Sequence, residues 1–208
     1  MAVIDYKTRT ISAKLVYWGA QGSGKTASVR YLWERTRGAD GQHAASEHDP
    51  GVATFDCLPL SLGAIRGFTT HFELHTVPGA RSYEAERRAL LDAVDGVVFV
   101  ADGRRGCFSE DVRSLGELES SLLSHDRALA ALPWVIQVNK RDLTDAMPTA
   151  ELLVTLGRYS PPCIESVATT GQGVFDALKA IAKLVLVELR SDSAASTSER
   201  SPPSVIPR

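Results

Sequence analysis

A glycine-rich segment near the N-terminus has the residue types and spacing of a phosphate-binding loop. The pattern Gly-x-x-x-x-Gly-Lys-Thr occupies residues 19–26, directly after the apolar residues 15–18. Glycines let backbone N–H groups surround a phosphate chain without a Cβ clash. Lys25 can reach the β- and γ-phosphates, and the hydroxyl of Thr26 can bind Mg²⁺. The predicted phosphate contacts are Gly19, Gly22, Ser23, Gly24, Lys25, Thr26 and Gly79.

A second motif, Asn139-Lys140-x-Asp142, indicates which base is bound. The carboxylate of Asp142 can accept hydrogen bonds from N1–H and the 2-amino group of guanine. Adenine has neither donor and would leave the carboxylate unpaired, which is costly. The stem of Lys140 can cover the base, and Asn139 can tie its loop to the P-loop. We also expect the N–H of Ala168 to meet guanine O6. The predicted guanine contacts are Asn139, Lys140, Asp142, Ala168 and Thr169.

Alternating strands and helices must position these residues. We expect strands at residues 11–18, 54–62, 67–77, 97–101, 134–138 and 163–168, with a short strand near residues 4–10. Helices are expected at residues 26–37, 82–94, 110–131, 150–156 and 174–189. This alternation predicts βαβ units, hence an α/β fold whose mostly parallel central sheet has helices on both faces. Ligands in such sheets bind at the carboxyl ends of the strands. The four positions expected to converge there are Gly19, Gly79, Asn139 and Ala168.

Two further segments have simple physical interpretations. The charge run Glu84, Glu86, Arg87 and Arg88 indicates the solvated face of the helix expected at residues 82–94. Residues 191–208 are rich in Ser and Pro, so we expect a disordered tail after a single domain at residues 1–190.

Composition excludes several classes of partner. With 208 residues and 44% hydrophobic content, the chain can form one ordinary core. A net charge of −2 gives no reason to expect nucleic acid as a partner. No signal peptide, lipidation motif or run of membrane-spanning length is visible. We therefore expect a cytoplasmic protein without a membrane anchor.

Longer segments resemble the MglA family of bacterial small Ras-like GTPases, over roughly residues 3–190. The segments that carry this resemblance include Pro59-Leu60, Arg66-Gly67-Phe68, Thr76-Val77-Pro78-Gly79, Asn139-Lys140-Arg141-Asp142-Leu143 and Val167-Ala168-Thr169-Thr170-Gly171. The resemblance implies a P-loop small GTPase fold that binds GTP or GDP with Mg²⁺. It also implies a molecular switch in bacterial cell polarity, motility or signalling, recruited to a cell pole. A Roadblock-type (MglB-like) regulator and effector proteins are the partners that the resemblance implies.

The chain departs from this family at its hydrolysis residues. Ala80 follows Gly79, where the family has a glutamine that positions the attacking water. Gln21 stands where Ras-like proteins usually have glycine, and its side chain would crowd the γ-phosphate. Gly51 and Val52 take the places of an arginine and a threonine in the first switch.

Thr54 is the only threonine in that loop and can reach Mg²⁺ after a two-residue shift, so Thr26 and Thr54 are the expected metal ligands. Apart from Thr54, no residue is assigned a catalytic role.

Three functions remain in competition. The first is a GTPase switch that hydrolyses GTP slowly or only with a partner, because the missing groups are worth several orders of magnitude in rate. The second is a non-hydrolysing scaffold that binds GTP or GDP and acts only through protein partners. The third is a P-loop kinase or other ATPase, which Asp142 disfavours.

Overall fold

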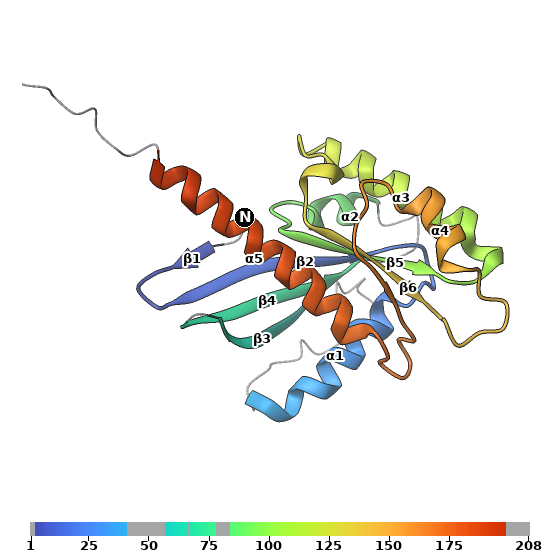
Figure 1. The fold of residues 1–208 in the computed structure, drawn as a ribbon, viewed down its shortest axis with the longest axis horizontal. Helices are drawn as coiled ribbons and strands as arrows, with labels where there is room; N and C mark the ends of the chain where they lie inside the picture. Colours follow the sequence, from blue (N-terminus) through green and yellow to red (C-terminus); the bar gives the residue numbers. More distant parts are fainter. Residues whose placement is uncertain (1–2, 41–56, 66, 78–83, 199–208) are drawn as a thin grey trace, which may run out of the picture.

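The protein is a seven-stranded sheet covered by helices, seen in a computed structural model that describes residues 3–40, 57–65, 67–77 and 84–198 (Figure 1). The strands are β1 (Val3–Asp5), β2 (Thr10–Trp18), β3 (Cys57–Ile65), β4 (Phe68–Thr76), β5 (Gly96–Asp102), β6 (Trp134–Asn139) and β7 (Cys163–Glu165). The helices are α1 (Lys25–Asp40), α2 (Glu84–Leu90), α3 (Phe108–Leu123), α4 (Thr149–Leu156) and α5 (Val174–Ser198), with short 3-10 turns η2 (Arg105–Cys107) and η3 (Leu129–Ala131).

The sheet has the order β3-β4-β2-β5-β6-β7, with β1 added beside β2. Strands β4, β2, β5, β6 and β7 run parallel to one another, whereas β3 pairs antiparallel with β4 and β1 pairs antiparallel with β2. All seven residues of β5 are buried, as expected for a parallel strand covered on both faces. The predicted α/β fold with a mostly parallel sheet is therefore confirmed.

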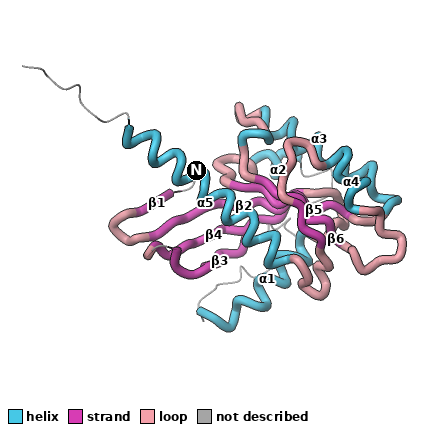
Figure 2. The backbone as a smooth tube through the Cα atoms, viewed as in Figure 1, coloured by secondary structure: helices cyan, strands magenta, loops and turns pink. Residues whose placement is uncertain are grey.

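Two hydrophobic cores lie on opposite faces of the sheet because successive strand residues point to opposite sides. In β2, Val16 and Trp18 belong to the core that includes residues of α3 and α4. Leu15 and Tyr17 belong to the other core, which includes residues of α1 and α5. Figure 2 shows α5 crossing the near face of the strands. In the described ranges, no helix combines the length and apolar character needed to cross a bilayer.

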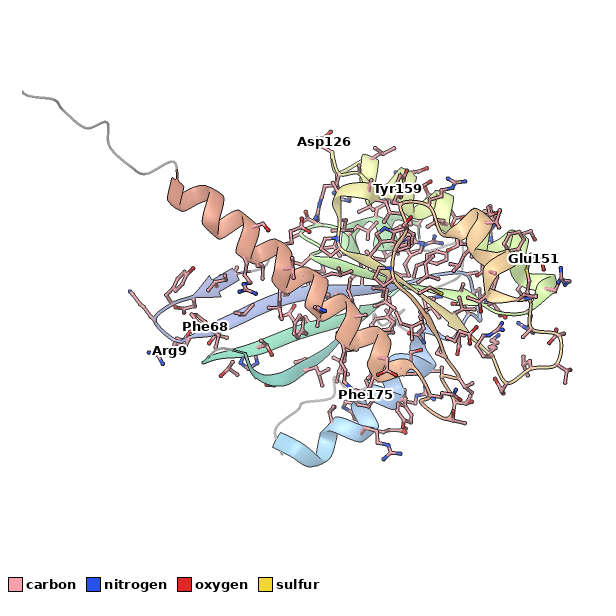
Figure 3. All side chains as sticks on the ribbon, viewed as in Figure 1. Arg9, Phe68, Asp126, Glu151, Tyr159 and Phe175 are labelled. Carbon is pink, nitrogen blue, oxygen red and sulfur yellow. The ribbon has the colours of Figure 1, made fainter. Side chains whose placement is uncertain are left out.

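The helix expected at residues 110–131 is interrupted. Helix α3 ends at Leu123, and Asp126, labelled in Figure 3, has a left-handed φ of 55°. The N–H of Arg127 then donates to the carbonyl oxygen of Leu122, which closes the turn. Leu129 therefore reaches the core from the separate 3-10 turn η3, not from one continuous helix.

Other boundaries also differ from the expected ones. Helix α5 continues to Ser198, beyond the predicted end at residue 189, and residues 191–198 of the predicted tail belong to it. Residues 199–208 lie outside the described ranges. Helix α1 continues through Gly38 to Asp40. Strand β7 ends at Glu165, not at residue 168, because the next residues turn back and Val167 pairs with Gln172.

Candidate nucleotide-binding site

The P-loop connects the end of β2 to the first turn of α1. Its glycines adopt backbone angles that other residues rarely take: φ is 148° at Gly19, 76° at Gly22 and 111° at Gly24. At Gly24 the lack of a side chain is also required by a neighbour, because a Cβ would lie 2.0 Å from Nδ2 of Asn139. The glycine spacing therefore serves both the loop's curvature and its contact with the base motif.

Lys25 is buried within this loop. Its ammonium group donates to the carbonyl oxygens of Gly19 and Ala20, at 2.9 Å and 2.7 Å. Burial, followed by the nearby charge of Arg87, lowers the pKa of Lys25 to about 8. An anionic phosphate beside this ammonium would favour its charged form. Thr26 and Gln21 are exposed to solvent, so both side chains are accessible to a ligand at the loop.

Asn139 joins the P-loop to the loop after β7. Its Nδ2 donates to the carbonyl oxygen of Ser23 at 2.8 Å, as the sequence predicts. Its Oδ1 accepts the backbone N–H of Ala168 at 2.8 Å and the hydroxyl of Ser166 at 3.3 Å. The predicted bond from the Ala168 N–H to guanine O6 stays a prediction; in this structure the N–H donates to Asn139. Ala168 thus supports the site through Asn139, and exposed Thr169 follows it.

A buried polar network beneath these loops is absent from the sequence-based predictions. Gln137 of β6 donates through Nε2 to the hydroxyl oxygens of Ser28, at 2.9 Å, and Ser166, at 3.0 Å. Ser28 in turn donates to the carbonyl oxygen of Gly24 at 3.0 Å. The one sign of this network in the sequence is Gln137, a polar residue within the apolar run at residues 134–138. The network fixes the first turn of α1 against the strand that carries the base motif.

The side chains of Lys140 and Asp142 lie in different environments. The ammonium of Lys140 contacts the carboxylate of Asp102 at 2.6 Å. Burial alone would raise the pKa of Asp102, but hydrogen bonds from Arg104 and Lys140 outweigh it and lower the pKa to about 2. The side chain of Asp142 is exposed and makes no ion pair within the described part of the chain. Its carboxylate is therefore accessible to a base.

The predicted solvated face of α2 is wrong at one position. Arg87 is buried, and it pairs with Glu117 of α3. Arg88 is exposed and pairs with Glu84 at 2.7 Å, as a solvated face would. A helix packed against a neighbour must bury one stripe, and here the long arginine side chain lies in that stripe with its charge paired.

Several predicted site residues lie outside the described ranges. They are Gly51, Val52, Thr54, Gly79 and Ala80. Within the described residues, the structure brings Gly24, Lys25, Asn139 and Ala168 to one end of the sheet. This is the carboxyl end of β2 and β6, where ligands of parallel sheets bind.

Comparison with known proteins finds a relative that matches nearly the whole chain. The mutual gliding-motility protein MglA of Myxococcus xanthus (strain DK1622) is 43% identical over 192 residues. The match covers 91% of this chain and 98% of that protein. No family model matches the chain.

Proposed function

Because this chain belongs to the MglA family of small Ras-like GTPases, we propose that it is a guanine-nucleotide switch whose own hydrolysis of GTP is slow or depends on a partner. The observation that carries the binding part is the position of Asn139. This one side chain holds both the P-loop, through Ser23, and the loop at Ala168. This link between the predicted phosphate loop and the predicted base loop supports the binding of one nucleotide across both.

The residues of the site divide between phosphate and base. Lys25 binds the β- and γ-phosphates, since its ammonium lies inside the curve of the loop. Asp142 accepts the N1–H and 2-amino groups of guanine, and Lys140 covers the base. Thr26, with Thr54, holds Mg²⁺. When bound, Mg²⁺ neutralises charge on the β- and γ-phosphate oxygens.

Slow hydrolysis follows from three sequence positions. Ala80 has no group that can orient water, and no arginine stands at Gly51. Gln21 is exposed at the P-loop, where its side chain competes with the attacking water for space beside the γ-phosphate. Groups of this kind are worth orders of magnitude in rate. A partner that supplies them in trans would restore turnover.

Membership in this family also supports a role in motility or cell polarity. The relative is named for gliding motility. We propose that the GTP-bound form acts in the cytoplasm, is recruited to a cell pole, and meets a Roadblock-type (MglB-like) regulator and effectors. A non-hydrolysing scaffold is the second candidate, and the same three positions favour it. Competition of ATP with GTP for the site would favour the third candidate, an ATPase.

The test of hydrolysis is to load the protein with GTP and Mg²⁺ and to follow GDP by chromatography over hours. We expect GTP to persist, and we expect Ala80→Gln to raise the turnover about tenfold or more. Formation of GDP by the unmodified protein within minutes would contradict slow hydrolysis. If GTP persists in the unmodified protein and Ala80→Gln does not raise the turnover, the non-hydrolysing scaffold becomes the better description.

The test of base recognition uses Asp142→Asn. The amide can donate to the C2 carbonyl of xanthine but cannot accept two bonds from guanine, so we expect GDP to bind about a hundredfold more weakly and xanthosine diphosphate to bind better. Unchanged GDP affinity, measured by titration, would remove Asp142 from the site.

A further inference from the structure

The ends of β5 and β6 are locked together next to the base motif. Asp102 is the last residue of β5 and stands in register with Asn139 of β6. The following N–H, from Gly103, donates to the carbonyl oxygen of Asn139 at 2.9 Å. A Cβ at residue 103 would lie 2.4 Å from that same oxygen, so only glycine permits the approach. The position of Asp102 relative to the motif is therefore set by the backbone.

From this position Asp102 holds the side chain of Lys140. The ammonium lies 2.6 Å from Oδ2 of Asp102, whose side chain is 1% exposed. Lys140 itself has a φ of 62°, the left-handed conformation that a non-glycine residue rarely adopts. Its stem must run from the end of β6 back to the end of β5. The ion pair thus fixes the direction of the stem without any contribution from a ligand.

Asp102 is the carboxylate that contacts two cations, Lys140 and Arg104. Arg104 donates through Nε to Oδ1 at 3.0 Å and through Nη2 to Oδ2 at 2.8 Å. A second carboxyl group, on Asp111, accepts the N–H of Asp102 at 2.8 Å, and Asp145 also acts electrostatically on Arg104. Burial raises the pKa of Asp111 to about 8, so it is mostly neutral at pH 7. Loss of the Asp102 charge would leave Arg104 and Lys140 to repel each other.

We propose that Asp102 is a positioning residue for guanine nucleotides, which holds Lys140 so that its stem lies ready to cover the base. The inference rests on the proposed guanine site and adds a residue from outside the Asn-Lys-x-Asp motif. A side chain that is ordered before binding loses less conformational entropy on binding. Asp102 therefore slows the release of nucleotide without touching it.

The experiment is a double-mutant cycle on the release of N-methylanthraniloyl-GDP from the full chain. The variants are Asp102→Asn, Lys140→Met and the two combined. We expect Asp102→Asn to speed release about tenfold, the scale of one charged hydrogen bond. In the Lys140→Met background, the same change should speed release by less than about twofold, because the side chain that it positions has gone. A purely structural role of Asp102 would have the same effect in both backgrounds.

The control is Glu151→Gln. This variant breaks the exposed ion pair in which Arg105 contacts Glu151 at 2.8 Å and 2.9 Å. Arg105 is three residues after Asp102 in the sequence, and Glu151 is labelled in Figure 3. Release from this variant should stay within about twofold of the unmodified protein. A change as large as that of Asp102→Asn would mean that loss of any ion pair made by the segment after β5 has the effect, and would overturn the proposal.

The outcomes separate the inference from the function on which it rests. If the unmodified protein fails to bind the GDP probe, the proposed guanine site is wrong and the inference fails with it. If it binds and the Asp102→Asn effect is undiminished in Lys140→Met, the inference alone is overturned. Circular dichroism checks the fold of each variant. Should Asp102→Asn fail to fold, Asp102→Glu replaces it, since the added methylene displaces the carboxylate but keeps its charge. Its effect must likewise disappear in Lys140→Met.

Discussion

The guanidinium of Arg87 lies 4.7 Å from the centre of the Trp18 ring. Trp18 is the residue directly before the P-loop, and its indole N–H donates to the carbonyl oxygen of Ser114 at 2.9 Å. Arg87 also pairs with Glu117, so α2, α3 and the start of the P-loop meet at one buried point. Since Arg87 contributes to the lowered pKa of Lys25, the position of α2 and the charge of the P-loop are electrostatically coupled.

Replacement of Arg87 by alanine should destabilise the protein. The variant loses a cation–π contact and, among the described residues, leaves Glu117 with its pair to Arg113, at 2.8 Å. We expect the free energy of unfolding to fall by about 2 kcal/mol, measured in urea with GDP bound. The control is Arg88→Ala, which removes an exposed pair and should cost no more than about 0.5 kcal/mol. Equal costs for the two variants would contradict the importance of the buried position.

Asp111 should make stability depend on pH. Burial raises the pKa of its carboxyl to about 8 from an ordinary value of 3.8, so the folded protein keeps a proton that the unfolded chain releases. Its contribution to stability is complete below pH 4 and is lost as the pH rises towards 8. Asp111→Asn cannot titrate, although its carbonyl can still accept the Asp102 N–H. The stability of this variant relative to the unmodified protein should therefore rise by at least about 1 kcal/mol between pH 5 and pH 8.

This pH effect is measured by urea unfolding at several pH values. Glu110→Gln is the matched control, because Glu110 is an exposed acid in the same first turn of α3. Its stability curve should run parallel to that of the unmodified protein. A parallel curve for Asp111→Asn as well would show that Asp111 is ionised in the folded state at pH 5.

Gly24→Ala should abolish nucleotide binding while the sheet remains intact. The added Cβ would meet Nδ2 of Asn139 and would also occupy a left-handed backbone conformation. The displaced Asn139 would release both loops, so we expect GDP affinity to fall at least about a hundredfold. Gly106→Ala is the control, since a Cβ there has no neighbour within 4 Å among the described residues. Titration with a fluorescent GDP measures both variants, and tight binding by Gly24→Ala would contradict the inferred contact.

Gly171→Ala tests how α1 supports the loop after Ala168. A Cβ at this position would lie 1.8 Å from Cζ of Tyr31, whose ring packs against Gly171. We expect a loss of about 2–3 kcal/mol in the free energy of unfolding, from this clash and from the left-handed φ of 83°. Adding Tyr31→Ala should recover the part that comes from the clash. If the loss of unfolding free energy in the double variant equals the sum of the losses in Gly171→Ala and Tyr31→Ala, measured by thermal or urea unfolding, the clash with the Tyr31 ring does not cause the destabilisation.

The local sequence pattern is sufficient to predict the two nucleotide-binding motifs. The spacing of glycines, Lys25 and Thr26 is a property of one continuous loop, and the motif that contains Asn139 is enough to predict its hydrogen bond to that loop. Continuous apolar runs likewise predicted the central strands, because burial on both faces of a parallel sheet requires apolar residues over the whole strand. Where a long helix ends was not predictable in this way. The turn at Asp126 depends on how Leu129 reaches the core, not on the spacing of the leucines.

The sequence by itself determined which nucleotide chemistry this protein is built for, because contiguous residues carry it. Only the tertiary structure decided which distant side chains support that chemistry. Asp102 and Lys140 are separated by 38 positions and meet because β5 and β6 are neighbours in the sheet. Arg87 and Trp18 meet because α2 packs over the end of β2. The roles of Asp102, Asp111 and Arg87 depend on burial and on partners that sequence spacing does not specify, because strand order and helix packing bring these residues together.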